Sequence, residues 1–586
     1  MKDIYSELLD LDNAYKKTTI DIVEGLPFSQ YDTLRTIEFY SNSKYTNGST
    51  DELNREKPFH NIVNANVDIA IVATDLDTKD IQISSKDNGM KGFVKSFLLK
   101  KELELWMREE NFAKTLNEIG ETRARYGGVL VKRVKEDGKL KIEVVQWKNV
   151  ATDPSDILNN PIIETHYLTV GQLQAKSDVW QNVDKALKLF KKGERKLKIL
   201  EVHGMFPECY LDESASDDSY SQQVHIIACA GSKNAVLFSS TEKELPYKYL
   251  PWKTVSGRAL GRGVVEEGIE AQVWTNDSVM AEREIMNLAG KLVLQTSSKK
   301  YSGRNVLNEL VTGTILEHED NRPITQVDLS PKTIPVFQSL VERWQRQYDR
   351  SSAITDALRG ETPPSGQAFR LQALVTQQSA SSFDYRREEL GIFIKDLFYS
   401  KGWVLDHLSA QLKKAHVMET DFDLEQLTFI DEAYINYLTE KELIKAKKEG
   451  TPLDPLQVQQ EMMNAREKIQ KTKTRRPLDV PEGYLDGKYS IDIVTTGEQV
   501  NKAATLESLS SILTLVAQNP MILQDPVLKD IMSRILEVSG IGISPAELMS
   551  RQPMMQPSPV SAPQAEQPST LPEPSSIGAG RVSANA

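Results

Sequence analysis

Cysteine is nearly missing from this chain of 586 residues, which holds only Cys209 and Cys229. Two cysteines cannot form a disulfide framework, and their separation matches no short-spaced metal-binding motif. The composition therefore excludes a small secreted domain held together by disulfides. A reducing compartment such as the cytoplasm suits this cysteine content.

Long hydrophobic runs are also lacking. No uninterrupted apolar stretch approaches the roughly 20 residues that a membrane span requires. The first residues, Met1, Lys2 and Asp3, do not begin the cationic segment and apolar run of a signal peptide. We therefore expect no membrane partner.

Positive charge is the third shortage, with 71 Lys and Arg against 83 Asp and Glu, a formal net charge of −12. Because neutralising phosphates requires clustered basic residues, this balance argues against tight non-specific binding to DNA. It is compatible with a protein that lets DNA pass without gripping it. One basic run, residues 471–476, is more typical of a solvated helix end than of a nucleic-acid contact.

Motifs for catalysis are lacking as well. The glycine-rich residues 257–263 are not followed by the Gly-Lys-Ser/Thr of a phosphate-binding loop, so a flexible loop is favoured over an ATPase site. The triplet 318–320, His-Glu-Asp, lacks the second histidine of a zinc-binding helix. Ser365 does not lie in a nucleophile elbow. We predict no catalytic, cofactor-binding or metal-binding residue, and hence no enzyme.

The composition that remains, 39% hydrophobic and 26% charged, is that of a folded chain. Its first half mixes helix and hairpin patterns. A helix pattern ends at residues 126–128, a buried strand follows at 129–131, and Asp137-Gly138 is a turn signal before a return strand at 142–146. Further strands are predicted at 198–205, 224–229 and 235–238. We expect an α+β fold that is mainly helical.

Two long helices frame a small β module in the middle of the chain. The first, Val264–Ala289, is about 40 Å long at about 1.5 Å per residue. In the second, apolar residues recur at helical spacing, namely at Phe337, Leu340, Val341, Trp344 and Tyr348. Three short strand candidates lie between the helices, at residues 291–295, 314–317 and 324–329.

An abrupt break follows the second helix. After Arg359 it comprises Gly360, Glu361, Thr362, Pro363, Pro364, Ser365, Gly366 and Gln367. Glycine allows unusual φ angles and each proline removes a donor, so no helix continues through these residues.

The stretch after the break is compatible with a helix but unusually polar. Residues 368–382 are rich in Ala, Gln and Ser, and a strong apolar stripe returns only at Phe393, Ile394, Leu397 and Phe398. Such a helix suggests packing against neighbouring copies of the chain, although an ordinary helix–loop–helix has equal weight from the pattern alone.

The remaining chain is helical until it loses its apolar residues. Helices are predicted at residues 403–414, 432–448, 456–471, 506–516 and 527–538, with one strand at 489–494. From residue 551 onward Pro, Ser, Gln and Ala dominate. That composition cannot bury enough apolar surface to order itself, so we predict a disordered tail.

The order of these elements resembles that of the portal proteins, or head-to-tail connectors, of tailed bacteriophages. Residues 59–64 look like the family's early wing helix, and residues 126–131 with 150–154 look like the β unit of the wing. Residues 245–263 resemble the approach to the stem, and residues 360–366 resemble the tunnel loop. The shared order of the elements carries the likeness.

The resemblance implies a portal-type multidomain subunit that forms a ring. Its expected parts are a wing at 1–255, a stem helix at 256–290, a clip at 291–331, a returning stem helix at 332–358, a tunnel loop at 359–367, a wing or channel helix at 368–410, a crown-like helical region at 411–550 and the disordered tail at 551–586.

The function implied by the resemblance is that of a conduit at one capsid vertex. The ring, usually a dodecamer in this family, would carry double-stranded DNA during packaging and ejection. Its implied partners are the large terminase subunit, the major capsid and scaffolding proteins, and later the head-completion and tail adaptor proteins. The implied location is the virion, and the host cytoplasm during assembly.

Two groups of residues receive roles in this interpretation. The tunnel loop would line the narrowest part of the channel. The contact with terminase or adaptor is placed on exposed basic and aromatic residues of the clip, namely Lys299, Lys300, Tyr301 and Arg304.

Two other classes of protein stay open at this point. One is a virion structural protein without an axial channel. The other is a nucleic-acid-processing motor subunit, which the missing nucleotide motif disfavours. A closed ring with a central hole distinguishes the portal from both.

Overall fold

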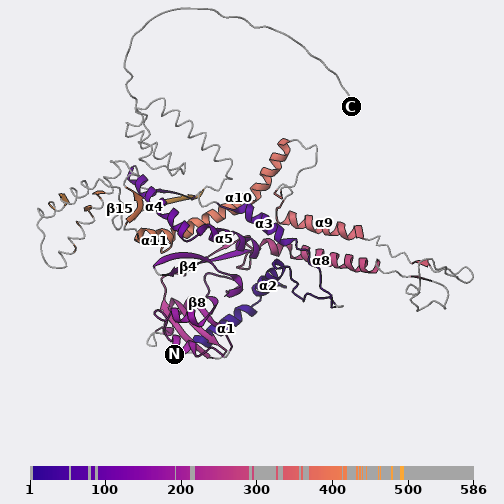
Figure 1. Cartoon of the computed structure of the whole chain (residues 1–586), viewed down its shortest axis with the longest axis horizontal. Helices are drawn as coiled ribbons and strands as arrows, with labels where there is room; N and C mark the ends of the chain where they lie inside the picture. The colour runs from indigo at the N-terminus through magenta and orange to yellow at the C-terminus, as the bar shows by residue number, and fades with distance from the viewer. Residues whose placement is uncertain are drawn as a thin grey trace, which may run out of the picture.

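The computed structural model describes residues 4–289 with short gaps at 52–53, 77–80, 86–89, 137, 192, 212–217 and 232. It also describes residues 334–354, 358–359 and 369–411, five short segments (294–295, 325–326, 414–418, 477–479 and 489–493) and a few single residues between 431 and 463. Within this part of the chain the fold is α+β and all paired strands are antiparallel. Figure 1 shows a hairpin of two helices projecting from a mixed body.

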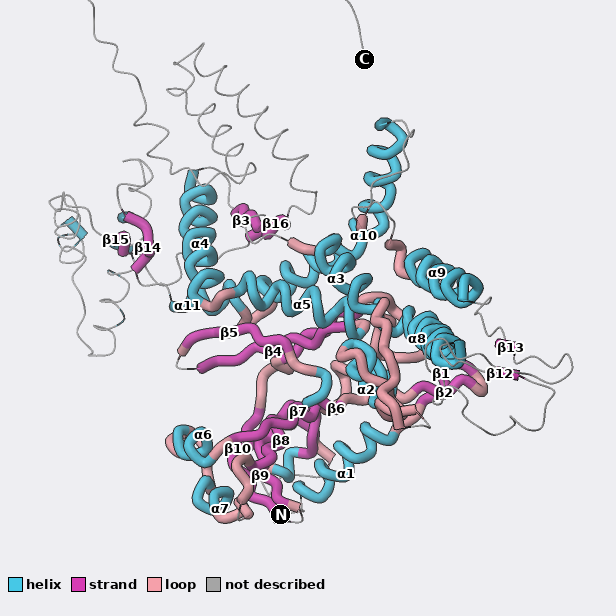
Figure 2. Tube along the Cα trace, turned by 45° about the vertical axis from the view of Figure 1, so that its right-hand side comes forward, coloured by secondary structure: helices cyan, strands magenta, loops and turns pink. Residues whose placement is uncertain are grey.

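A five-stranded sheet builds the lobe nearest the N-terminus (Figure 2). Its strand order is β10 (Lys233–Thr241), β9 (Tyr220–Ala230), β8 (Leu197–Pro207), β7 (Ile162–Leu168) and β6 (Val150–Ala151). Because successive side chains of a strand point to opposite faces, each face has its own core. Helix α1 (Ile4–Lys17) packs on one face, and the short α6 (Val170–Ala175) and α7 (Val183–Leu187) pack on the other.

A three-stranded sheet lies between this lobe and the main helices (Figure 2). Its order is β11 (Tyr247–Pro251), β4 (Gly128–Glu136) and β5 (Lys139–Val144). The largest apolar cluster joins it to α4 (Met90–Glu109), α5 (Phe112–Tyr126), α10 (Phe369–Tyr399) and α11 (Val404–Gln411). At its centre the rings of Trp106, Phe112 and Phe398 meet, with centroids 5.4 to 6.3 Å apart.

A second cluster holds the base of the projecting hairpin. It combines α2 (Gln30–Ser41), α3 (Val63–Thr74), the first turns of α8 (Val264–Ala289), the end of α9 (Ile334–Ser351) and Phe383 of α10. Its contributors come from distant parts of the sequence, so the hairpin stands on a base that only the folded chain provides.

Shorter strands complete the described part of the chain. Strand β1 (Ile20–Val23) pairs with β2 (Leu26–Phe28), and β14 (Lys414–Met418) pairs with β15 (Pro477–Asp479). Two single-turn helices, η2 (Trp147–Asn149) and η3 (Glu208–Tyr210), link other elements. The longest-range pairing joins β3 (Ile81–Ser85) to β16 (Tyr489–Ile493), and Tyr489 belongs to the largest apolar cluster.

Three glycines allow two chain segments to cross in contact. Gly127 ends α5 with a φ of +88°, and a Cβ there would overlap the carbonyl oxygen of Gly261 and lie 2.7 Å from the nitrogen of Gly263. A side chain at Gly127 is therefore excluded by both the left-handed backbone and the crossing segment. The glycines of residues 257–263, which the sequence favours as a flexible loop, thus include two that fit a close backbone contact.

Several sequence predictions are confirmed. Helix α8 spans Val264–Ala289, and α9 contains the predicted stripe from Phe337 to Tyr348. Strands β4, β5, β8, β9, β10 and β16 lie at the predicted positions. Of the β module between the helices, β12 (Leu294–Gln295) pairs with β13 (Thr325–Gln326), whereas the candidate at 314–317 lies outside the described residues. The helix predicted at 403–414 is shorter, because α11 ends at Gln411 and β14 begins at Lys414.

Among the described residues, no helix combines the length and apolar content that crossing a bilayer requires.

Candidate functional site

The two groups of residues singled out from the sequence lie outside the described part of the chain. These are the tunnel loop from Gly360 to Gln367 and the clip residues Lys299, Lys300, Tyr301 and Arg304. The triplet 318–320 and the regions predicted as crown helices and tail are largely or wholly outside it too. What the structure describes is the framework that leads into and out of these segments.

The framework's most distinctive element is the hairpin of α8 and α9. The hydroxyl of Tyr348 donates to the carbonyl of Val264 at 3.0 Å, and a Cβ on Gly268 would lie only 2.6 Å from the Tyr348 ring. Further out, the indoles of Trp274 and Trp344 stack with centroids 5.9 Å apart and planes 4° from parallel. The helices are therefore antiparallel and in contact over several turns.

A buried polar cluster fixes the point where the returning helix rejoins the body. The amide of Asn66 on α3 donates to Asp349 at 3.0 Å and to Ser352 at 3.2 Å. Arg359 donates to Asn66 at 3.0 Å and pairs with Asp349. Because Arg359 directly precedes Gly360, the chain enters the predicted tunnel loop from a fixed position.

A second buried cluster fixes α10 to the body. The guanidinium of Arg123 donates to the carbonyl of Pro251 at 3.0 Å, to the carbonyl of Arg386 at 2.7 Å and to the carboxylate of Glu389 at 2.6 Å. Burial lowers the pKa of Arg123 to about 10, against the opposing effect of Glu389. Arg386 lies 4.2 Å from the ring centroid of Trp252, which Arg123 also approaches. Strand β11, α5 and α10 are thereby joined at one point.

A network of charged side chains joins the two sheets. Lys132 of β4 donates to Glu164 of β7 at 2.9 Å and to Glu201 of β8 at 2.6 Å. The ring nitrogens of His203 lie 3.0 Å from Glu201 and 2.8 Å from Glu242. Burial alone would penalise each of these charges, and their mutual pairing offsets that penalty.

The pKa directions in this network agree with that geometry. Burial opposes the charged form of Glu201, but hydrogen bonds from His166 and His203 and the charge of Lys132 hold its pKa well below the usual range. Burial likewise opposes protonation of His203, yet its bonds to Glu201 and Glu242 raise its pKa. Both ring nitrogens of His203 face a carboxylate oxygen, and only the protonated ring can donate to both.

Part of this network has the composition of a metal site. Oxygen and nitrogen atoms of Glu164, His166 and Glu201 lie within 4.8 Å of one another. The Lys132 ammonium, however, already contacts the carboxylates of both Glu164 and Glu201. A metal ion would have to displace that ammonium, so we assign the cluster as a structural ion-pair network that attaches one sheet to the other.

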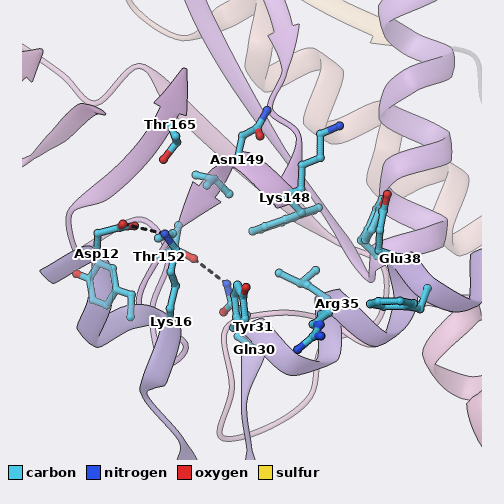
Figure 3. Close-up of a pocket in the computed structure, with 17 residues that line it drawn as sticks. Asp12, Lys16, Gln30, Tyr31, Arg35, Glu38, Lys148, Asn149, Thr152 and Thr165 are labelled. Carbon is cyan, nitrogen blue, oxygen red and sulfur yellow. Dashed lines mark hydrogen bonds and ion pairs between the residues drawn. The ribbon is translucent and has the colours of Figure 1, made fainter. Parts of the chain in front are cut away.

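A cavity of about 200 Å³ lies between α1, α2 and the segment around η2 (Figure 3). The amide of the buried Gln30 donates to Thr152 at 2.8 Å, and Lys16 donates to the buried Asp12 at 2.8 Å. Arg35 and Glu38 line it from α2. The Gln30–Thr152 bond joins two walls of the cavity, whereas the Lys16–Asp12 bond lies within α1, so the cavity marks the joint between the N-terminal helices and the first sheet.

The sequence did not reveal the charge network. Its histidines are scattered along the chain, and Lys132, Glu164, Glu201 and Glu242 come from four separate segments. One signal was present: a Glu is followed two positions later by a His at 164 and 166 and again at 201 and 203, so each pair lies on one face of its strand, and the second strand is mostly buried. Polar residues repeated on a buried face indicate partners on a neighbouring element.

Comparison with known proteins adds no relative to this description. No protein-family model matches the chain, and no curated protein matches it in sequence. The function must therefore be argued from the arrangement of the elements.

Proposed function

We propose that this chain is the subunit of a bacteriophage portal, a ring at one capsid vertex through which double-stranded DNA passes. The antiparallel hairpin of α8 and α9 carries the proposal. It projects from an α+β body (Figure 1), and the residues expected to form the clip connect its two helices. A stem that leaves the body and returns to it is the feature that the resemblance requires.

The chain order around the hairpin supports the same assignment. The wing-like sheets precede α8, the polar cluster of Asn66, Asp349 and Arg359 closes the base of α9, and the predicted tunnel loop follows directly. Helix α10 then crosses the body and packs in its largest apolar cluster. In this proposal the loop lines the channel, and α10 positions it from the other side.

The net negative charge of the chain suits a channel through which DNA passes better than a protein that binds DNA tightly. With a net charge of −12, the protein does not hold phosphates along its whole surface, so DNA slides. Terminase would supply the ATP-driven motor as a separate partner and dock on the clip, around Lys299, Lys300, Tyr301 and Arg304. Head-completion and tail proteins would replace it after packaging.

The first test is the shape of the assembled protein. We expect the purified full-length chain to form closed rings with a central hole in negative-stain electron microscopy, and mass photometry to give one dominant oligomer. A chain that remains monomeric, or that assembles into sheets without an axial hole, would contradict the proposal and favour a non-portal virion protein.

A further inference from the structure

The two helices of the projecting hairpin carry charges of opposite sign on their exposed sides. Helix α8 exposes Glu270, Asp277 and Glu284. Helix α9 exposes Arg343, Arg346 and Arg350. We call these the acidic stripe and the basic stripe. Glu270, Asp277 and Glu284 are seven positions apart, as are Arg343 and Arg350, so the residues of each set lie on one side of their helix.

Each stripe faces away from the other helix of its own hairpin. At about 100° per residue, Glu270, Asp277 and Glu284 point within about 20° of directly opposite Gly268, which contacts Tyr348 of α9. Counted from Tyr348, which bonds to Val264 of α8, the three arginines also point within about 40° of directly opposite. The hairpin therefore has an acidic outer edge and a basic outer edge.

Two edges of opposite charge, on opposite sides of the hairpin, are suited to a head-to-tail contact between identical chains. We infer that the acidic stripe of one subunit docks on the basic stripe of the next, an inference that rests on the proposed ring. Such a contact uses two different surfaces of each copy, so it propagates from subunit to subunit and ends only when the ring closes. Arg346 pairs with Glu342 of its own helix at 3.3 Å, and both side chains are exposed.

The heights of the charges along the hairpin agree with this contact. Trp274 lies level with Trp344, and Glu282 lies level with Gln338, whose side chains are 3.4 Å apart. By this alignment Glu270 falls between Arg346 and Arg350, and Asp277 falls near Arg343. A rotation axis parallel to the hairpins shifts no subunit along the axis, so residues that pair between neighbours must lie at equal heights.

By the same alignment, no basic residue of α9 as the structure describes it, Ile334–Ser351, lies opposite Glu284. Glu284 is level with Val336, which is 56% exposed, and not with an arginine. The charge variants therefore alter Glu270 and Asp277 and leave Glu284 in place.

Charge exchange tests the contact with the full-length protein. One variant combines Glu270→Lys and Asp277→Lys, which makes both edges basic, and the other combines Arg343→Glu and Arg350→Glu, which makes both edges acidic. We expect each variant alone to lose rings by about tenfold or more, and an equimolar mixture to recover them, because unlike edges then alternate. Ring content is measured by negative stain and mass photometry, and folding by circular dichroism.

One control variant and a test at high salt accompany the exchange. Lys185→Glu in α7, combined with Lys188→Glu directly after it, changes two exposed residues outside the hairpin and should leave the ring fraction close to that of the unaltered protein. High salt should weaken the unaltered ring, since exposed charges are screened.

The outcomes separate this inference from the proposed function. If the unaltered chain forms no ring, the portal proposal fails. If it forms rings and both charge variants do so equally well, or if the mixture of two inactive variants recovers nothing, the docking of the stripes is wrong while the portal proposal stands. The head-to-tail contact is supported if each variant fails to form rings by itself and the equimolar mixture forms them.

Discussion

At the scale of single residues, the most consequential side chain is His203. It lies between two carboxylates in a nearly water-free position, with 4% of its side chain exposed. Its neighbours come from every element around it: Glu201 on its own strand, Glu242 after β10, Lys132 on β4, Glu164 and His166 on β7, His225 on β9 and Tyr247 on β11. A positive charge is thus built into the joint between the two sheets.

This charge predicts how stability depends on pH. The pKa of His203 is raised above its unfolded value of about 6.5, so its contribution is complete below pH 6.5 and is lost as the pH rises through the folded pKa. His225, whose pKa burial lowers to about 4, acts in the opposite sense and costs stability as the pH falls from about 6.5 toward 4. In denaturant unfolding across pH 4 to 9, the summed contribution of the two histidines to the free energy of unfolding should be largest near pH 6.5.

Two variants test which histidine causes the acid part and which the alkaline part of the stability profile. His203→Gln should cost about 3 kcal/mol at pH 6, because it removes the cation beside Glu242 and one of the cations beside Glu201, and it should flatten the alkaline limb. His225→Gln should flatten part of the acid limb and leave the alkaline limb in place. An alkaline limb that survives His203→Gln would show that His203 is not the titrating group.

At the scale of elements, α10 is positioned by a cation and not only by apolar packing. Arg123 reaches from α5 to two carbonyls and one carboxylate, and its side chain is 1% exposed. The guanidinium has several donors in a fixed plane, so it satisfies acceptors on two elements at once. A lysine offers no such fork.

Removing this cation should loosen α10. Arg123→Met leaves Glu389 without its buried partner and should lower the free energy of unfolding by about 3–5 kcal/mol. Lys114→Ala on the same helix removes only the exposed pair with Glu118 and should cost less than about 0.5 kcal/mol. Equal losses for the two variants in urea titrations would contradict the assigned role of Arg123.

The sequence specified the elements whose signals are local. Helix α8 was predicted with its observed bounds, because its apolar pattern is continuous from Val264 onward. The partners of those elements could not be predicted, because register and charge pairing depend on residues far apart in the chain. The sequence near Lys132 does not indicate that Glu164 and Glu201 are its partners. The sequence near Gly261 indicates a turn, and its close contact with Gly127 is visible only in the folded structure. The roles expected of Pro363, Pro364 and the clip residues stay predictions.

At the scale of the whole molecule, the last described strand packs in a core built mainly by residues 76–142 and 390–405. Strand β16, which begins at Tyr489, pairs with β3 of the wing-like region, and the Tyr489 side chain is 5% exposed. The body expected to end before residue 411 therefore includes a strand from the region expected to be crown-like.

Tyr489 tests how much of the body depends on this late strand. Tyr489→Ala should lower the free energy of unfolding by about 3–5 kcal/mol, as the loss of a large buried aromatic side chain usually does. The matched variant Tyr220→Ala removes a tyrosine that is 58% exposed and should change stability by less than about 1 kcal/mol. A Tyr489→Ala protein as stable as the unaltered one would place this strand outside the cooperative unit.

The pairing of β3 with β16 also implies a delay between the synthesis of the two strands. During synthesis, β3 leaves the ribosome about 400 residues before its partner, which at roughly 5–20 residues per second is a wait on the order of 20–80 s. Throughout that time one edge of β3 lacks the strand that pairs with it in the finished fold. A chain truncated before residue 489 never completes that edge, so β3 keeps an open edge that pairs in the finished fold.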